Sequence, residues 1–319
     1  MRTNPTFSSS APATPRREPV RVLTVDVEEA WQTEVARKVV DRSSWDDLEA
    51  RVEVGTRAVV EMMGRNDVRG TFFFLGCVAR RHPGLVREVA AAGHEIACHG
   101  DQHDHLSRLD AARMRVDVER ARKTLEDLVG EAVVGYRAPT WSVTRRTAWA
   151  VDVLLEAGFV YDASVFPTVH PSYGVPDAPL GPFRLKGHEA GGELLEIPPV
   201  MWRVGQWRVG QRRVPVAGGG YFRLLPSWLM ERGIEQAGRE GRPAVVYFHP
   251  WEFDEEQPRL AMPWLSRVRM YAGVSTALER LEGVVKKFAG WTPVRERIAE
   301  LEGMSVGGGV VVLGGRKAA

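Results

Sequence analysis

The chain has 319 residues, of which 44% are hydrophobic, and its 43 basic and 41 acidic residues give a net charge of +2. This balance argues against a dedicated nucleic-acid-binding protein, and no apolar stretch is long enough to cross a membrane. The two cysteines, Cys77 and Cys98, cannot form a disulfide framework and are interpreted as small buried residues. Residues 1–19 lack the apolar core of a secretory signal, so we predict a disordered tail and a cytoplasmic protein.

Strand and helix patterns then alternate along the chain. Continuous apolar or β-branched runs predict buried strands at 20–25, 70–75, 94–98, 133–136, 159–161, 194–197 and 244–248. Helical spacing predicts helices at 48–63, 82–92, 111–128, 144–157 and 293–301. The alternation predicts an α/β fold with a parallel sheet, and seven or eight units favour a distorted (β/α) barrel as a single domain over 20–290. Residues 291–319 are expected to form a helix and a Gly-rich tail.

The alternation breaks between residues 167 and 226, where proline and glycine are frequent. This stretch contains a tandem duplication, in which WRVGQ at 202–206 is followed by WRVGQ at 207–211. We interpret the duplication as a lengthened β-hairpin, and the alternative is a tryptophan that stacks on a sugar. The three glycines at 218–220 are not read as a phosphate-binding loop, because no Lys-Ser or Lys-Thr pair follows them.

Polar residues follow several of the predicted strands. They are Asp26, His99, Arg137, Asp162 and His249. The carboxyl ends of parallel strands meet at one end of a barrel, and that end carries the active site in barrel enzymes. A structural role gives no reason for such a placement, so we expect these side chains to form a catalytic site.

Two histidines four residues apart, His99 and His103, form the most informative pattern of the chain. Such a pair alone is weak evidence for a metal site. A cluster of carboxylates, Asp26, Glu28 and Glu29, follows the first predicted strand. Two histidines and one carboxylate can hold a catalytic divalent ion and leave positions open for water and substrate.

Seven segments carry a resemblance to a known family. They are TVDVEEAW (24–31), TFFFLG (71–76), AGHEIACHGDQHDHL (92–106), GYRAPTWSVT (135–144), YDASVFP (161–167), PVAGGGYFRLLP (215–226) and VVYFHPWEFD (245–254). In this order they resemble the polysaccharide deacetylases of carbohydrate esterase family 4, and most closely the subgroup linked to exosortase and exopolysaccharide loci. The resemblance implies a distorted (β/α) barrel and the metal-dependent removal of N-acetyl groups from amino sugars of a polysaccharide or oligosaccharide.

The resemblance also implies roles for individual residues. Asp26 lies at the position of the family's catalytic base, and His99 and His103 lie at the positions of its metal-binding histidines. Arg137 corresponds to the arginine that orients the base, and His249 corresponds to the catalytic acid.

The chain departs from the family at the third metal ligand. That ligand is usually an aspartate directly after the base, where this chain has Val27. The carboxylate shifts to Glu28, in the Asp-x-Glu form of the subgroup, and Glu29 is the alternative ligand. Asp162 fits the family only loosely, and it is either a turn-forming residue or the partner that orients His249.

The same residues account for amide hydrolysis in chemical terms. A single divalent ion polarises the carbonyl and acidifies a bound water; zinc is expected, with cobalt, nickel, manganese and iron as alternatives. Asp26 takes the proton from the water, Arg137 keeps Asp26 ionised, and His249 protonates the leaving nitrogen. The backbone N–H of Thr140 is expected to complete an oxyanion hole.

The sequence thus favours a metal-dependent N-deacetylase with an N-acetylated glycan as its partner, and it leaves the oligomeric state open. A second candidate is a small-molecule C–N hydrolase for a cyclic imide or ureide, for which a capped pocket would replace an open groove. A non-catalytic carbohydrate-binding module is less well supported, because base, acid, arginine and ligands are all present. Trp141 and Trp251 are expected to wall the pocket rather than pack in the core.

Overall fold

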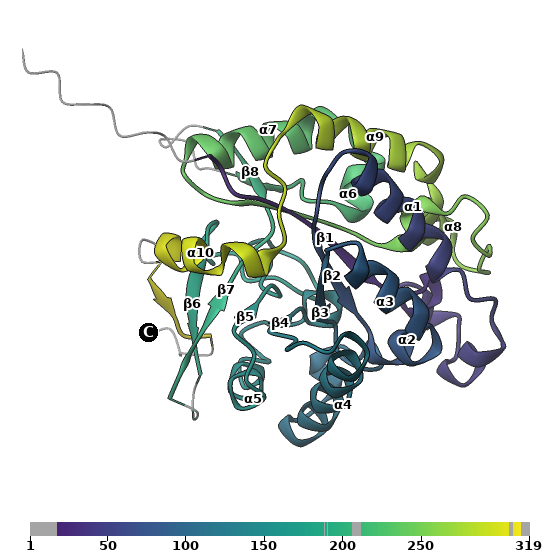
Figure 1. Ribbon diagram of the computed structural model, residues 1–319, viewed down its shortest axis with the longest axis horizontal. Coiled ribbons are helices and arrows are strands. Elements are labelled where there is room, and N and C mark those ends of the chain that lie inside the picture. The colour runs from purple at the N-terminus through teal and green to yellow at the C-terminus, as the bar shows by residue number, and fades with distance from the viewer. Residues whose placement is uncertain (1–17, 188, 190, 206–211, 306–308, 314–319) are drawn as a thin grey trace, which may run out of the picture.

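The computed structural model describes residues 18–187, 189, 191–205, 212–305 and 309–313 as a curled sheet with helices outside it (Figure 1). The strands are β1 (Arg21–Val27), β2 (Thr71–Phe74), β3 (Glu95–Cys98), β4 (Gly135–Tyr136), β5 (Tyr161–Asp162), β6 (Phe183–Lys186), β7 (Glu193–Glu196), β8 (Met201–Val204), β9 (Arg212–Pro215), β10 (Ala244–Phe248) and β11 (Val310–Val311). The α-helices are α1 (Val52–Arg65), α2 (Gly76–Arg81), α3 (Pro83–Ala91), α4 (Ala111–Val129), α5 (Ala150–Glu156), α6 (Gly219–Leu224), α7 (Ser227–Arg239), α8 (Trp264–Tyr271), α9 (Val274–Lys287) and α10 (Ile298–Ser305).

Most strands of the main sheet run parallel. Their order is β10-β1-β2-β3-β4-β5-β7-β6-β11, in which β6 is antiparallel to β7. Two backbone hydrogen bonds connect the chain after β7 back to β10: Val200 N donates to Val245 O at 2.9 Å, and Tyr247 N donates to Ala217 O at 3.0 Å. The parallel strands therefore curl into an irregularly closed (β/α) barrel, and the predicted fold class is confirmed.

Strand β1 lies in the middle of this arrangement, between β10 and β2. Six of its seven residues are buried, because a parallel strand is covered on both faces. In the register, Val27 lies beside Phe74 on β2, and Phe74 lies beside Cys98 on β3. The carboxyl ends of β1 and β3 are therefore level, and the residues that follow them share one edge of the barrel.

Side chains fill the inside of the barrel. Alternate residues of neighbouring strands form this apolar cluster, which includes Val22, Phe73, Ala97, Leu195 and Val245. Val294 and Leu301 from the C-terminal segment join the same cluster and close the amino end of the barrel. The packed interior leaves the carboxyl ends of the strands as the place where a site can open to solvent.

Local sequence signals explain where the helices begin and end. Helix α4 begins at Asp110, whose carboxylate accepts a hydrogen bond from Arg113 N at 2.8 Å, and it ends at Gly130 in a left-handed conformation. Helix α5 begins six residues later than predicted. The Thr147 hydroxyl donates to Ser142 O at 2.6 Å and accepts from Thr144 N, so the chain forms turns there instead of a helix.

Several elements differ from the prediction or fall outside it. Helices α7, α8 and α9 were not predicted, and they cover the barrel on the side of α1 (Figure 1). Strand β8 pairs with β9 in an antiparallel hairpin, as the duplication predicted. Residues 206–211, and residues 1–17 of the predicted disordered tail at 1–19, lie outside the described residues. Of the predicted Gly-rich tail, residues 306–308 and 314–319 also lie outside them.

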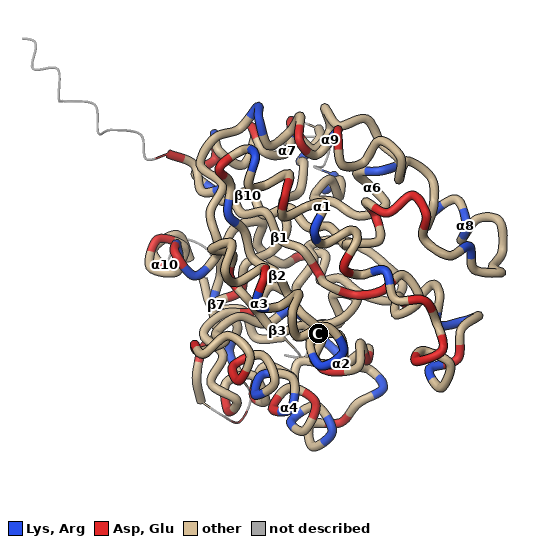
Figure 2. The backbone as a smooth tube through the Cα atoms, turned by 45° about the vertical axis from the view of Figure 1, so that its right-hand side comes forward, with Lys and Arg blue, Asp and Glu red and all other residues tan. Residues whose placement is uncertain are grey.

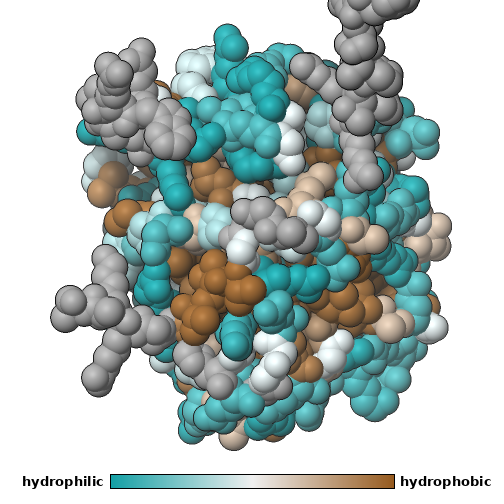
Figure 3. All heavy atoms as spheres, turned by 90° about the vertical axis from the view of Figure 1, so that its left-hand side faces the viewer, coloured by the Kyte–Doolittle hydropathy of each residue, from teal (hydrophilic) through white to brown (hydrophobic). Residues whose placement is uncertain are grey.

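The face on the side of α10 carries hydrophobic side chains in separate patches among hydrophilic ones (Figure 3). Among the described residues, no helix combines the length and the apolar character that a membrane span requires.

Candidate metal centre and catalytic site

Glu28, His99 and His103 come together at the carboxyl edge of the barrel. Glu28 follows β1, His99 follows β3, and His103 lies in the loop four residues further on. All three are buried, and their ligand atoms lie within 4.8 Å of one another. Glu28 Oε2 lies 2.6 Å from His103 Nε2 and 3.8 Å from His99 Nε2. This is the donor set of a divalent metal site with open positions.

Two observations show that these residues fit a metal ion. Glu28 Oε2 is buried, and besides the imidazoles of His103 and His99 it has no hydrogen-bond partner among the described residues, which favours a cation beside it. His99 Nδ1 lies 2.7 Å from Arg137 O, so the imidazole donates its proton there and turns Nε2 toward Glu28. A ligand histidine held by a backbone carbonyl is the usual arrangement in metal sites.

The protonation states of His99 and Glu28 also suit metal binding. Burial lowers the pKa of His99 to about 4, so its imidazole is neutral near pH 7. Burial alone would raise the pKa of Glu28, yet the neighbouring histidine charges, His103 first, lower it to about 2. A neutral imidazole and an ionised carboxylate are the forms that bind metal.

Glu29 serves a different purpose from Glu28. Its carboxylate accepts hydrogen bonds from Arg51 N at 3.0 Å and from Val52 N at 3.1 Å, which are the first amides of α1. It therefore caps that helix, as acidic groups do at helix N-termini. Of the two carboxylates that the sequence left open, Glu28 is the one that faces the histidines.

Asp26 is held by a fully buried arginine. Arg137 NH1 donates to Asp26 Oδ1 at 2.6 Å, and it also donates to Thr24 Oγ1 at 2.8 Å. The guanidinium lies over the rings of Phe73 and Trp141, 4.2 and 4.7 Å from their centroids. Because the guanidinium is fully buried and packs against these two rings, it holds the Asp26 carboxylate in a defined direction.

His249 lies across from Asp26 and Glu28. Its Nε2 is 3.9 Å from Asp26 Oδ2 and 3.8 Å from Glu28 Oε1, while its Nδ1 is 2.7 Å from Glu252 Oε1. Burial would lower the pKa of His249, but the hydrogen bond to Glu252 and the charge of Glu28 raise it to about 9. The imidazole is therefore protonated at neutral pH and can act as an acid.

The sequence did not identify the pair that holds His249. Glu252 is fully buried, and Arg223 Nε donates to its Oε2 at 2.7 Å. Glu252 lies three residues after His249, and its carboxylate accepts a hydrogen bond from the backbone N–H of His249. This is the spacing of a capping box, and it is the signal in the sequence by which Glu252 could have been identified. Arg223 lies in α6, inside the resembling segment 215–226, but the sequence analysis assigned it no role.

The interpretation of Asp162 as the partner of His249 is wrong. Its carboxylate accepts hydrogen bonds from Ala163 N at 2.9 Å and from the hydroxyl of Ser164, and its other neighbour is Glu196. Burial raises the pKa of both carboxyl groups, that of Asp162 to about 6. Asp162 therefore has the alternative, turn-forming role at the end of β5.

The two tryptophans differ in their surroundings. Trp141 is 6% exposed and packs edge-on against Phe166 and Tyr247, so its indole belongs to the core, contrary to the prediction. Trp251 stacks on His249 with ring centroids 5.1 Å apart and borders the site as predicted. Thr140 and Trp141 both have left-handed backbones, with φ of 57° and 53°, a strain that proteins retain mainly at functional sites.

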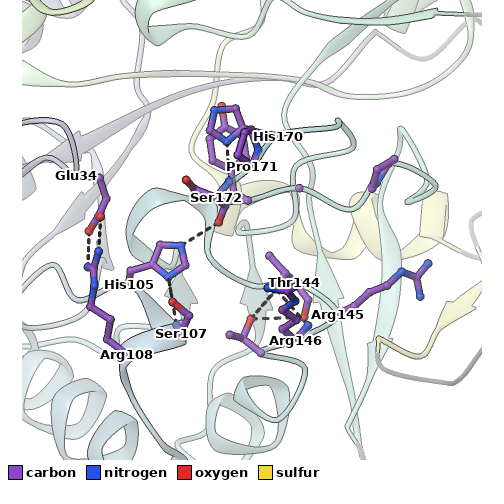
Figure 4. Close-up of a pocket in the computed structure, with 14 residues that line it drawn as sticks. Glu34, His105, Ser107, Arg108, Thr144, Arg145, Arg146, His170, Pro171 and Ser172 are labelled. Carbon is purple, nitrogen blue, oxygen red and sulfur yellow. Dashed lines mark hydrogen bonds and ion pairs between the residues drawn. The ribbon is translucent and has the colours of Figure 1, made fainter. Parts of the chain in front are cut away.

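A cleft of about 460 Å³ begins two residues after His103. Figure 4 shows hydroxyl and basic side chains around it, and its lining includes His105, Arg108, Thr144, Arg146, His170 and Ser172. His105 Nε2 bonds Ser172 O at 3.0 Å, and Arg108 pairs with Glu34 (Figure 4). The cleft is open to solvent, and Glu28, His99, His103, Asp26 and His249 are not among the residues that line it.

Comparison with known families divides the chain into two parts. Residues 36–160 match the family described as polysaccharide deacetylase, and residues 163–299 match a domain of unknown function, DUF3473. The chain is similar to the peptidoglycan deacetylase of Helicobacter pylori, with 27% identity over 113 residues, which are 35% of this chain and 38% of that protein. It is also similar to the chitooligosaccharide deacetylase of Rhizobium leguminosarum bv. trifolii, with 29% identity over 99 residues, 31% of this chain and 43% of that protein.

The chain thus spans less than half of the length of these two relatives. Among solved structures, a polysaccharide deacetylase from Mycobacterium smegmatis shares the fold, with a TM-score of 0.59, 22% identity and coverage of 94% of this chain and 96% of that one. Puue allantoinase does so with a TM-score of 0.58, 18% identity and coverage of 93% and 95%. Together, the family match and these curated relatives show that residues 36–160 of the chain belong to the polysaccharide deacetylase family.

Proposed function

We propose that the protein is a metal-dependent hydrolase that removes N-acetyl groups from amino sugars of a polysaccharide or oligosaccharide. One observation carries the proposal above all. A buried ligand set of Glu28, His99 and His103 lies beside a carboxylate, Asp26, and a protonated imidazole, His249, which face each other across 3.9 Å. Amide hydrolysis needs this combination of base, acid and electrophile.

The residues present fit one divalent ion, for which we propose zinc. Bound by Glu28, His99 and His103, the ion would supply a Lewis acid for the amide carbonyl and lower the pKa of a water. Cobalt, nickel, manganese and iron suit the same two nitrogens and one oxygen.

The protein's own groups would handle the protons. Arg137 bonds Asp26 Oδ1, so Oδ2 is left to accept a proton from the attacking water. His249 Nε2 would donate its proton to the leaving nitrogen, and Glu252 would hold the imidazole in place through Nδ1. The N–H of Thr140 would stabilise the oxyanion, and the left-handed backbone of Thr140 supports a functional role for this residue.

An extended glycan is the substrate that the surroundings favour. The open cleft of about 460 Å³, which His105 helps to line, offers room for the sugar units of an extended chain, whereas a small cyclic ureide would need a capped pocket. The names of the related deacetylases support a glycan, and the exopolysaccharide subgroup remains part of the proposal. A cytoplasmic location is proposed as well, because Cys77 and Cys98 are both free.

The test is acetate release from a panel of N-acetylated oligosaccharides, with one cyclic ureide included, by the purified protein loaded with zinc. We expect acetate from at least one glycan and no product from the ureide. The Asp26→Asn variant should keep its metal and lose nearly all turnover, because Asp26 acts as the base and not as a ligand. Hydrolysis of the ureide alone, or loss of metal in proportion to activity, would contradict these roles.

A further inference from the structure

Helix α8 exposes a large apolar face that the proposed reaction does not use. Its residues Trp264, Leu265 and Val268 are 69%, 55% and 43% exposed, whereas Met270 is 3% exposed and anchors the helix. A single exposed hydrophobic residue is ordinary. Three of them on a helix of eight residues form an apolar surface, and such surfaces normally bind a partner. The helix therefore presents one face to the protein and an apolar face to its surroundings.

Basic residues flank this apolar face on both sides. With about 100° per residue, Trp264, Val268 and Leu265 lie next to one another on the helix, and Arg267 and Arg269 lie at the two borders of the face. Figure 2 shows α8 projecting from the molecule with basic positions along it. An apolar face bordered by arginines is the pattern of a helix that lies in the interface of a lipid bilayer.

The charge of the segment is one-sided. Residues 257–278 contain Arg259, Arg267 and Arg269 but no Asp or Glu. All three arginines are exposed, and none of them forms an ion pair with a described residue. Most arginines elsewhere on the described surface pair with carboxylates, as Arg57 does with Glu88 at 3.0 Å. The segment thus keeps its positive charge available for an anionic partner.

From these observations we infer that α8 binds the surface of anionic lipid membranes, with Trp264, Leu265 and Val268 inserted between headgroups and the arginines on lipid phosphates. A sugar ring would contact only the tryptophan, and a single acidic side chain would contact only one of the arginines. The combination of an apolar strip with basic borders matches a lipid surface, in which apolar chains lie beneath a layer of negative charge.

The location of α8 links this surface to the catalytic site. Arg223 NH2 donates to Arg269 O at 2.7 Å, and the same guanidinium holds Glu252, which holds His249. The backbone of α8 is thus two side chains away from the proposed acid. A helix bound to the membrane would keep the site close to a glycan attached there, and this consequence, unlike the binding itself, rests on the proposed function.

The test is co-sedimentation of the full chain with vesicles of phosphatidylcholine alone and of phosphatidylcholine with phosphatidylglycerol. We expect binding to the anionic vesicles that weakens with salt and is at least about tenfold weaker on neutral ones. The double variant Trp264→Ala, Leu265→Ala should lose about tenfold or more of this binding. Trp228→Ala, on α7 and 51% exposed, is the matched control and should bind like the native protein.

A second variant, Arg267→Glu with Arg269→Glu, keeps the apolar face and reverses the charge at its borders. It should bind anionic vesicles no better than neutral ones, while its circular dichroism remains native. Equal binding by all variants, no binding by the native protein, or a dimer that forms without lipid and is lost on Trp264→Ala would each overturn the inference. Because sedimentation needs no substrate, its result is independent of whether acetate release is found.

Discussion

Asp26 and His249 meet opposite requirements within a few ångströms. The base must be ionised and the acid must be protonated at the same pH. The structure meets both with separate partners: Arg137 donates to Asp26, while Glu252 accepts from His249 and raises its pKa to about 9. The pair keeps its two protonation states because each side chain is bound to a group of the opposite charge.

The His249→Ala variant tests the acid directly. It should lower turnover of an amide by about 10² or more, because the leaving nitrogen needs a proton. An activated aryl ester, whose leaving group needs none, should lose much less. Steady-state rates on both substrates give the comparison, and equal losses would assign His249 to binding or structure instead.

The sequence could identify residues whose role depends on nearby chain positions, and it failed where the role depends on packing. His99 and His103 are four residues apart, and Asp26 ends an apolar run, so a pattern marked them. Asp162 also ends a strand, yet Glu252 is the group that reaches His249. Glu252 lies only three residues after His249, and this capping-box spacing was the signal that distinguished it from Asp162.

At the scale of elements, the loop between β3 and the next helical turn carries both histidine ligands. Its His103 has a left-handed backbone with φ of 53°, which a residue other than glycine adopts only when its surroundings enforce it. Asp101, fully buried in this loop, bonds Arg80 at 2.6 Å and also Arg120. These two ion pairs tie the loop to α2 and α4.

Breaking this tie should loosen the metal site from a distance. Asp101→Ala should weaken zinc binding about 10–100-fold, the usual cost of losing a group that supports metal ligands. Competition titration with a chelator measures the affinity. Asp110→Ala, which removes the N-cap of α4 and about 1 kcal/mol of stability, is the control and should keep zinc affinity. Unchanged affinity in Asp101→Ala would limit Asp101 to stability.

A neighbouring carboxylate makes stability depend on pH. Asp117 accepts a hydrogen bond from Asp101 N at 2.8 Å, and burial raises its pKa to about 6. An unfolded aspartate loses its proton near pH 4, so between about pH 4 and 6 the folded state binds more protons and stability from this group falls as pH rises.

Asp117→Asn removes this titration and keeps an oxygen that can accept the same hydrogen bond. Its free energy of unfolding, relative to the native protein, should therefore rise by on the order of 3 kcal/mol between about pH 4 and pH 7. Urea denaturation in the presence of a chelator gives the two values. If the difference in free energy of unfolding between the two proteins does not change with pH, the pKa of Asp117 is not raised in the folded state.

At the scale of the whole molecule, the barrel was predictable and its closure was not. Buried parallel strands such as β1 and β10 read as continuous apolar runs, and alternation with helices then gives the architecture. The closing contacts connect the predicted strand β10 with Val200 and Ala217, which lie in segments that no strand or helix pattern marked. Helix α9 was missed although Ala277, Leu281 and Val284 have helical spacing.

In the proposed function, Glu28, His99 and His103 form a metal site on which activity depends. Metal content after purification and zinc loading, measured by elemental analysis on the native protein, Glu28→Gln and Glu29→Gln, tests it most directly. We predict one metal per chain in the native protein and in Glu29→Gln, and almost none in Glu28→Gln, with acetate release following the metal. A Glu28→Gln protein that keeps its metal and its activity would contradict the account.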